Sequence, residues 1–312
     1  MNKKIIIMIS VILSMFLLSG CSGGNTQQVT VDNPYLGGSQ GLIATFEPMG
    51  IADNGGTESI YENEEFPVDI TLKNQGEFNV PANSVKTNLK GITTADYTGL
   101  TMDTTTNPAI EKISTYNQKG GETTITHNKG KIIPARMAGR NIMTANIFAN
   151  VIYPYETYVS APKVCFKSTS GKDTGVCEVE NAALQVFSSG APIRAVSAKE
   201  TRAGTNVVSV EFTIENAGGG ESKSKTKTEF DYRYNDIDFE VGSSTPSGIW
   251  TCTNAGKAGI ARFGEDNKLT IICKSIPSAI QTGSVYQSQL DLVLKYDYKV
   301  VISRNLIIKG NQ

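Results

Sequence analysis

The sequence contains a single histidine, His127, among its 312 residues. This scarcity excludes metal centres that are built on several imidazole ligands. A Ser-His-Asp triad would need this one side chain beside a nucleophile, and no Gly-x-Ser-x-Gly elbow surrounds any candidate serine. Because His127 lies in Thr-Ile-Thr-His-Asn-Lys-Gly, close to a turn signal, we expect a surface histidine rather than a catalytic one.

Charged residues are also scarce, at 19% of the chain, and the two signs nearly cancel. Once Lys3 and Lys4 are removed with the first 20 residues, 27 basic side chains (29 less 2) stand against 30 acidic ones. A net charge of −3 does not favour nucleic acid or an anionic membrane surface as a partner. Glycine-rich phosphate loops and dinucleotide fingerprints are absent as well, so we expect no cofactor.

Convincing amphipathic helices are missing too, apart from a possible short one at 108–116. Strand patterns dominate instead, because residues 68–73 and 208–215 alternate strictly between apolar and polar side chains. Further strands are expected at 146–153, 290–294 and 300–308. The length suggests two domains of ordinary size. The expected fold class is therefore all-β.

The N-terminus has the features of a signal peptide. Lys3 and Lys4 precede a short apolar run from residue 5 to 18, and Leu-Ser-Gly-Cys21 follows. This ending resembles the lipobox of prokaryotic lipoproteins, in which the Cys thiol receives a diacylglycerol and the chain is cut before it. An uncleaved signal anchor is the alternative, but the run is shorter than the roughly 20 residues of a spanning helix. We expect residues 1–20 to be removed and Cys21 to carry the lipid.

Residues 21–40 are polar and contain Gly-Gly at 23–24 and 37–38. We interpret this stretch as a tether. A flexible chain of about 20 residues has an r.m.s. reach of about 25 Å, which would lift a domain clear of lipid headgroups.

Four further cysteines lie in two local pairs, Cys165 with Cys177 and Cys252 with Cys273. An even count in an exported chain favours disulfides within each pair. A four-cysteine zinc site is the rival, although neither pair has the short spacing of zinc ligands. Each bridge would contribute roughly 3 kcal/mol in the chain-entropy view.

An internal repeat is the most useful pattern. Val-Asp-Ile-Thr-Leu-Lys-Asn74-Gln-Gly76 matches Val-Glu-Phe-Thr-Ile-Glu-Asn216-Ala-Gly218 at an offset of 142 residues. The tyrosines match at an offset of 143, with Tyr153 and Tyr155 corresponding to Tyr296 and Tyr298. Two separate matches at nearly one offset indicate a duplication. We therefore predict two β-sandwich domains, 41–189 with a long insert at 91–145, and 190–312, joined near Ser-Ser-Gly-Ala-Pro.

These motifs also carry a resemblance. The Asn-x-Gly strand followed by Val85-x-x-Asn-Leu resembles the early strands of immunoglobulin-like, cell-adhesion-related domains of bacterial and archaeal surfaces. Tyr-Pro-Tyr-Glu-Thr from Tyr153, followed by Val-Cys165 and Val-Cys177-Glu, resembles uncharacterised surface proteins of small-genome archaea. The resemblance implies two tandem immunoglobulin-like sandwiches and a surface location, and it implies no activity.

Three acidic side chains, Asp236, Asp238 and Glu240, alternate along one predicted strand face. Hard cations such as Ca²⁺ require several oxygen ligands, and this face would be part of such a site. No glycine-punctuated Asp loop accompanies it, so a solvated strand face is the favoured interpretation and no metal site is expected.

Two other groups invite functional interpretations. The four repeated tyrosines would make an aromatic ligand platform, but residues that match between two repeats more often serve the fold. Lys223, Lys225 and Lys227 alternate on one face, which is more typical of edge-strand protection than of a phosphate patch. Trp250 shares parity with Cys252, so its indole is expected in the core beside the second bridge.

We therefore expect a non-enzymatic protein outside the cell, attached to the membrane through Cys21, that binds a protein or glycan partner or organises the envelope. Two alternatives remain, a lipoprotein subunit that captures a small ligand and an extracellular hydrolase. Binding is expected in loops, either in the 91–145 insert or in the 218–229 segment.

Overall fold

The two strands that alternate most strictly in the sequence are central strands of the computed structural model. β4 (Phe66–Asn74) buries every second side chain, and β13 (Val207–Asn216) buries the apolar positions from Val208 to Ile214. β-branched and aromatic side chains fit this half-buried pleated surface. The structure describes residues 31–310, except 171–174, 180–181 and 232, and residues 33–312 form one compact unit.

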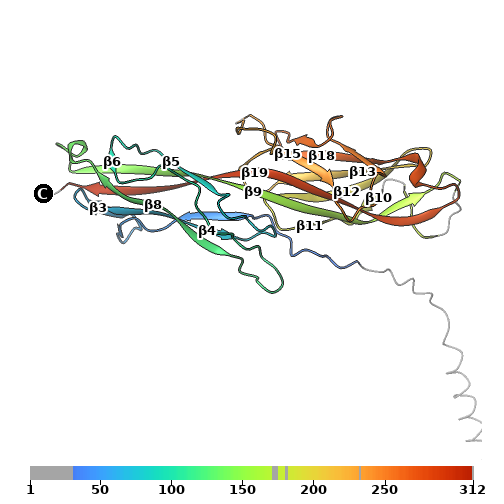
Figure 1. Ribbon diagram of the computed structural model, residues 1–312, viewed down its shortest axis with the longest axis horizontal. Coiled ribbons are helices and arrows are strands. Elements are labelled where there is room, and N and C mark those ends of the chain that lie inside the picture. The colour runs from blue at the N-terminus through green and yellow to red at the C-terminus, as the bar shows by residue number, and fades with distance from the viewer. Residues whose placement is uncertain (1–30, 171–174, 180–181, 232, 311–312) are drawn as a thin grey trace, which may run out of the picture. The chain divides into compact units, whose positions relative to one another are not determined.

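Three sheets make up this unit (Figure 1). The four-stranded sheet has the order β1 (Leu42–Phe46), β4, β8 (Glu122–Ile132) and β6 (Tyr97–Thr98). The five-stranded sheet has the order β10 (Ala182–Leu184), β12 (Ile193–Gly204), β13, β18 (Lys268–Ser275) and β16 (Trp250–Thr253).

The third sheet has ten strands and is built around two long ones, β9 (Ile142–Lys167) and β19 (Val285–Lys309). Its main path runs β17 (Ile260–Arg262), β15 (Asp236–Val241), β19, β9, β5 (Lys86–Lys90) and β7 (Asp103–Thr104). Short strands complete it: β2 (Ile51–Ala52), β3 (Glu58–Tyr61), β11 (Phe187–Ser188) and β14 (Glu221–Lys223). Two 3-10 turns, η1 (Pro134–Arg136) and η2 (Pro277–Ala279), lie in connections.

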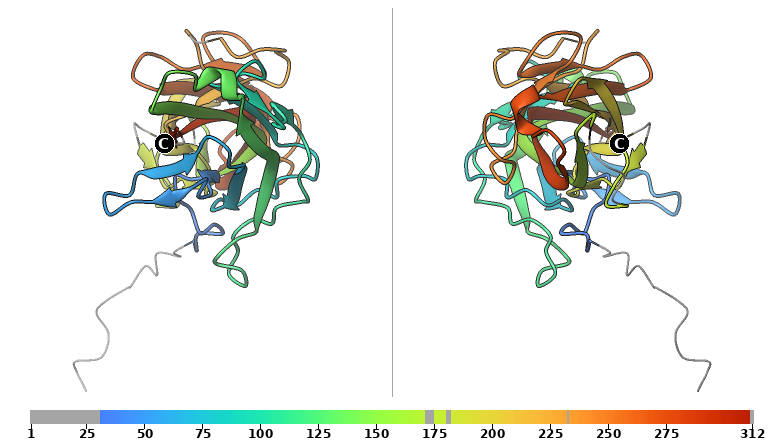
Figure 2. Two further views of the ribbon diagram at one scale, coloured as in Figure 1. Left: turned by 90° about the vertical axis from the view of Figure 1, so that its left-hand side faces the viewer. Right: turned by 90° about the vertical axis from the view of Figure 1, so that its right-hand side faces the viewer.

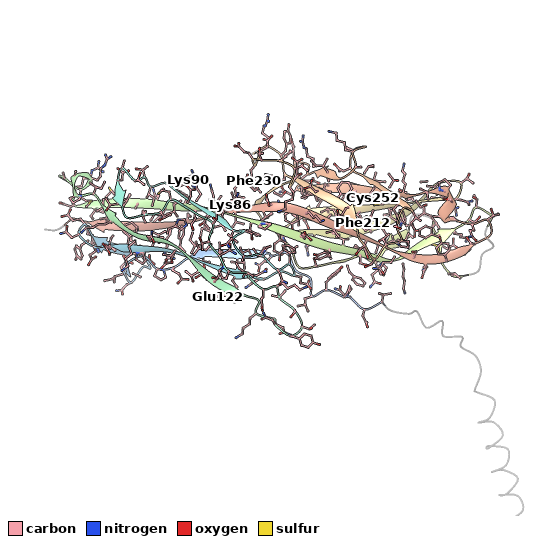
Figure 3. The ribbon with its side chains drawn as sticks, viewed as in Figure 1. Lys86, Lys90, Glu122, Phe212, Phe230 and Cys252 are labelled. Carbon is pink, nitrogen blue, oxygen red and sulfur yellow. A yellow bond between two sulfur atoms is a disulfide. The ribbon has the colours of Figure 1, made fainter. Side chains whose placement is uncertain are left out.

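The ten-stranded sheet takes part in two β-sandwiches, seen end-on as stacked layers in Figure 2. In the first sandwich it faces the four-stranded sheet, and the Thr87 hydroxyl of β5 bonds His127 of β8 across the interior. In the second sandwich it faces the five-stranded sheet, and Phe166 of β9 packs edge-on against Trp250 of β16 at 5.5 Å. Figure 3 shows Phe212 in the second sandwich. The expected all-β sandwich class is confirmed.

β9 and β19 run through both sandwiches. They pair antiparallel along their whole lengths, from Lys167 opposite Val285 to Ile142 opposite Lys309, with one register shift. The sequence predicted three shorter strands here, because alternation shows that a segment is extended but not where a strand stops.

The expected boundary at residues 189 and 190 therefore does not separate the two sandwiches. β19, which the prediction assigned to the second domain, pairs with β3 and β9 of the first, and β9 continues into the second sandwich. The cause is geometric, because each long strand exceeds the height of one sandwich and its remainder must be covered by the other.

The stretch 91–145 is not an insert either. It contains β6, β7, β8 and the first residues of β9, and its side chains Ile125, Ile132 and Ala145 are buried in the first sandwich. The possible helix at 108–116 does not form; Ile110 instead makes an isolated β-bridge with Val80.

The predicted tether is shorter than 21–40, because its last residues dock onto the unit. The Glu77 carboxylate accepts hydrogen bonds from the backbone N–H groups of Leu36 (3.0 Å), Gly37 (2.9 Å) and Gly190 (2.6 Å). This carboxylate joins the start of the unit to the connection that precedes β12. Cys21 and residues 1–20 lie outside the described residues.

Both predicted disulfides are present, Cys165–Cys177 and Cys252–Cys273. The second joins directly opposed residues of β16 and β18, beside Trp250, which is buried as expected. Among the described residues, no helix has the length and apolar character needed to cross a membrane.

Candidate functional site

Four buried tyrosines mark the point where the two sandwiches meet. Tyr153 lies opposite Tyr298 and Tyr155 opposite Tyr296 in the β9–β19 register. The ring centroids of these pairs are 5.9 and 6.3 Å apart, within the range of favourable aromatic contacts. All four side chains are at most 1% exposed. They form part of the core.

Each Asn-x-Gly turn is locked onto one of these tyrosines. Tyr298 donates its hydroxyl hydrogen to Oδ1 of Asn216 at 2.8 Å and accepts one from the N–H of Gly220 at 2.7 Å. Burial raises the pKa of Tyr298 to about 12, so its hydroxyl remains a donor at neutral pH. The matching tyrosine, Tyr155, bonds Oδ1 of Asn74 in the same manner.

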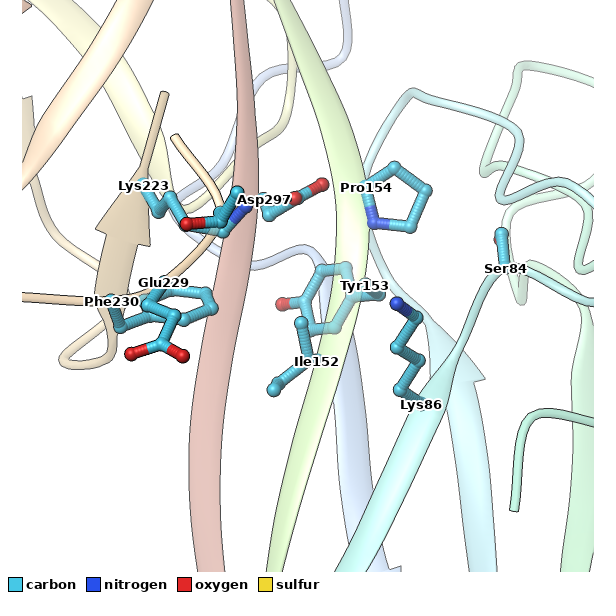
Figure 4. A pocket seen from close by; sticks show the side chains of 10 residues that line it. Ser84, Lys86, Ile152, Tyr153, Pro154, Lys223, Glu229, Phe230 and Asp297 are labelled. Carbon is cyan, nitrogen blue, oxygen red and sulfur yellow. Dashed lines mark hydrogen bonds and ion pairs between the residues drawn. The ribbon is translucent and has the colours of Figure 1, made fainter. Parts of the chain in front are cut away.

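A pocket of about 440 Å³, which we call the junction pocket, lies on the opposite, outward side of the β9–β19 pair (Figure 4). Ile152 and Pro154 of β9 and Asp297 of β19 form its floor. β5 supplies one wall, with Lys86, and β14 with the segment after it supplies the other. The lining residues are Ser84, Lys86, Ile152, Tyr153, Pro154, Lys223, Thr228, Glu229, Phe230 and Asp297.

The two walls of this pocket carry opposite charges around an aromatic ring. Among the described residues, neither Lys86 nor Glu229 has an ion-pair partner in the protein. Phe230 lies between two ammonium groups, Lys299 at 4.9 Å and Lys223 at 5.6 Å from the ring centroid. The pocket therefore offers one free cation, one free carboxylate and apolar surface to a ligand.

The three lysines that follow one another in this wall are paired with acids. Lys223 donates to Asp297 at 2.8 Å and Lys225 pairs with the same carboxylate, while Lys227 pairs with Asp236. Burial raises the pKa of the Asp297 carboxyl, but the hydrogen bonds and charges of Lys223 and Lys225 outweigh it and lower that pKa. The lysines neutralise the buried Asp236 and the half-buried Asp297, and they do not form a free phosphate patch.

The acidic strand face at β15 is divided among separate partners. Asp236 is 2% exposed and pairs with Lys227 and with Arg262 at 2.9 Å, so the expectation of a solvated face is wrong at this residue. Asp238 accepts from the N–H of Lys225 at 2.6 Å, and Glu240 pairs with Lys295 at 2.7 Å. Within the described part of the chain, no group of three or more His, Cys, Asp or Glu side chains converges on a common point.

His127 is not on the surface as expected, because it is fully buried between the sheets of the first sandwich. Its Nε2 lies 2.8 Å from the Thr87 hydroxyl and its Nδ1 lies 2.6 Å from the carbonyl oxygen of Thr101. Burial lowers its pKa below the ordinary value. Its parity with Ile125, two residues earlier, was the sequence signal for an inward position.

A second buried titratable group is Glu200 of β12, and no sequence pattern indicated that it would be buried. It is 1% exposed and accepts a hydrogen bond from the N–H of Cys165 at 2.8 Å. Its other oxygen, Oε2, has no partner among the described residues. Burial raises the pKa of Glu200 to about 8, although the Cys165 N–H opposes this rise.

The junction pocket itself could not be recognised from the sequence. Its lining combines residues 84–86, 152–154, 223–230 and 297, and only the folded sheet brings these segments together. The segment 218–229, where binding was expected, does contribute Lys223, Thr228 and Glu229 to one wall.

Comparisons with known proteins give no relative by sequence, since no family model and no curated protein matches the chain. Weak likenesses to solved structures exist. The secreted serine protease VesC from Vibrio cholerae aligns at 9% identity and a TM-score of 0.20, over 83% of this chain and 50% of that one. The B domain of a biofilm associated protein aligns at 11% and 0.19, over 86% and 75%. The collagen adhesin CNA from S. aureus aligns at 10% and 0.14, over 87% and 93%.

This chain thus spans half of the protease chain. TM-scores of 0.14 to 0.20 do not indicate a shared fold.

Proposed function

We propose that this protein is a lipid-anchored binding module of the cell surface, which is held by a lipid on Cys21 and offers the junction pocket to a protein or glycan partner. The observation that carries the proposal is the construction of the pocket. One wall comes from β5 and the other from the segment after β14, and the continuous β9–β19 pair fixes their separation.

A rigid pocket of this kind favours binding for a physical reason. Association costs free energy when side chains and loops must become ordered, and a preformed site avoids much of that cost. Phe230 is held by its lysine neighbours, while Lys86 and Glu229 remain available for hydrogen bonds with a partner. A polar glycan or a protein segment with both charges complements these groups.

The anchor is tested by Cys21→Ala. Lipid labelling of the protein should disappear, and the protein should remain as precursor or be released to the medium. Labelling that is unchanged in this variant excludes the lipid on Cys21, without bearing on the pocket.

The pocket is tested by photo-cross-linking in intact cells. A cross-linking side chain at position 86 should capture a partner, whereas the same side chain at position 90 should not. Lys90 is a matched control because it lies on the same strand, is exposed and does not line the pocket (Figure 3). Phe230→Ala should reduce the capture from position 86, and equal capture from both positions would contradict the proposal.

The capture of a small ligand remains the second candidate, because about 440 Å³ lies within the usual range for small-molecule sites of about 300–1,000 Å³. Native mass spectrometry of protein purified from its own cells distinguishes the two. A bound small molecule that is lost in Phe230→Ala favours capture. The hydrolase alternative gains no support from His127, since both ring nitrogens already have partners inside the sandwich.

A further inference from the structure

The two halves of the chain are related by an approximate two-fold axis. The repeat equates residue 154 with residue 297, and these two residues lie directly opposite each other in the β9–β19 register. A strand pair that maps onto itself when its strands are exchanged must lie on a two-fold axis. The axis therefore passes through the Pro154–Asp297 pair, with the tyrosines on either side.

The hydrogen bonds around the axis follow the same relation. The side-chain amide of Asn74 donates to the backbone carbonyl of Phe78 at 2.7 Å. In the same way, the side-chain amide of Asn216 donates to the backbone carbonyl of Gly220 at 2.8 Å. The turn that follows each asparagine is equivalent as well, since Gln75 N–H donates to Gly41 and Ala217 N–H to Pro192.

The hydrogen bonds of Tyr153 and Tyr296, the other equivalent pair of tyrosines, are also related, with one difference. The Tyr153 hydroxyl donates directly to the carbonyl of Leu42, the first residue of β1, at 3.2 Å. The Tyr296 hydroxyl instead lies 2.9 Å from that of Thr157, which donates to the carbonyl of Ile193, the first residue of β12. Leu42 and Ile193 occupy the same place, because they pair with Asn74 and Asn216.

Each half passes the end of its long strand into the sandwich of the other half. β9 begins beside β5 of its own half and ends in the second sandwich, where Val159, Val164 and Phe166 are fully buried. β19 begins beside β15 of its own half and ends in the first sandwich, where Leu306 and Ile308 are fully buried.

We propose that the protein consists of two fused units, each of which contributes the end of its long strand to the sandwich of the other. We propose further that each half can bind the complementary half of a second copy of this chain in place of the complementary half of its own chain. The surface that recognises the partner comprises the free end of the long strand and the gap which that strand fills in the other sandwich. Because burying apolar side chains stabilises a complex, the three of β9 and the two of β19 give each half a strong preference for its complement. The proposal does not depend on the junction pocket.

The partner is a second copy because its halves carry long strands that match this chain's own in register and in their tyrosines. Within one chain the fused complement has the advantage of a high effective concentration. At high protein concentration during folding, a half from another molecule competes with it, which is the usual route to exchanged dimers.

The test uses the soluble mature chain with a site-specific protease sequence inserted at Gly175. Val176, the next residue, is 51% exposed, so an inserted sequence beside it would be accessible to the protease. Cys165→Ser with Cys177→Ser removes the bridge that would hold the cut pieces together. If the double variant fails to fold uncut, the bridged protein is cut and then gently reduced.

After cutting, the two pieces should stay together as one complex and melt in one transition. When light and isotopically heavy cut proteins are unfolded, mixed and refolded, native mass spectrometry should find hybrids in their statistical share. Leu306→Ala should weaken the complex because Leu306 is buried across the axis, whereas Val301→Ala should not, because Val301 is 56% exposed on the same strand. Pieces that separate as folded monomers, or that refold without hybrids, overturn the proposal.

The second-copy binding is measured on uncut chains. Heavy and light chains refolded together at high concentration should yield a dimer that contains one of each. Monomers alone at every concentration would overturn this part of the proposal.

Discussion

The hydroxyl of Tyr298 donates a hydrogen bond to Oδ1 of Asn216 across 2.8 Å, and Tyr155 makes the equivalent bond to Asn74 at 3.3 Å in the other half. We predict that Tyr298→Phe and Tyr155→Phe each lower the free energy of unfolding by about 1–3 kcal/mol, because each removes two hydrogen bonds of a buried hydroxyl, one to the asparagine and one from a backbone N–H. Urea denaturation measures this loss. The control is Tyr158→Phe, which should cost less because its half-buried hydroxyl makes one hydrogen bond, to Glu156.

The glycine of each Asn-x-Gly turn leaves space for the same hydroxyl. A Cβ on Gly218 would lie 2.6 Å from the Tyr298 hydroxyl oxygen and 2.5 Å from the Cβ of Pro192, and a Cβ on Gly76 would collide with the Tyr155 hydroxyl oxygen. Gly218→Ala should destabilise the protein by about 1–3 kcal/mol, the usual cost of overpacking. Thermal melting should show that adding Tyr298→Phe restores part of this loss. If the double variant is no better than the sum of its single changes, the clash is not with the hydroxyl.

The pKa of Glu200 makes stability depend on pH at neutral values. Burial raises the pKa of Glu200 from 4.5 to about 8 in the folded protein, so the unfolded chain loses this proton at a lower pH than the folded one. Stability is therefore full below about pH 4.5 and declines as pH rises through 8. Glu200→Gln keeps an oxygen for the Cys165 N–H and cannot ionise. Denaturation curves should show that the free energy of unfolding of the variant, compared with that of the unchanged protein, is more favourable at pH 8 than at pH 4.5. An identical pH profile in the variant would contradict this assignment.

His127 has the opposite effect on the acid side. Burial lowers its pKa from 6.5, so the unfolded chain binds this proton more readily than the folded one. Stability is full above pH 6.5 and falls as pH decreases through the folded pKa. His127→Gln should flatten the decline between pH 6.5 and 5, at a cost of about 1–3 kcal/mol at pH 7 from imperfect replacement of two buried hydrogen bonds. Urea titrations at a series of pH values test both effects, and a steeper decline in the variant would contradict the first.

Local patterns predicted much of this fold. The alternation in β4 and β13 needs only neighbouring residues to be recognised, and both disulfides join residues that are close in sequence. The 142–143-residue offset correctly indicated two similar halves, since the equivalent asparagines and tyrosines make equivalent bonds.

The exchange of long strands was not predictable in this way. Residues such as Leu306 and Ile308 alternate as they would in any sandwich, and alternation does not specify which sheet a strand joins. The pocket was missed for the same reason, because Lys86 and Phe230 are far apart in the sequence and meet only across the β9–β19 pair. His127 was misplaced because the adjacent turn signal outweighed its parity with Ile125.

The continuous β9–β19 register constrains how this sequence can diverge. A one-residue deletion near Pro154 would shift every later residue of β9 by one place and turn Tyr155, Thr157 and Val159 away from the core. A compensating deletion in β19 would disturb the first sandwich in turn. Homologues should therefore vary in length in their surface connections, while the two long strands keep a constant number of residues between the tyrosines and their ends.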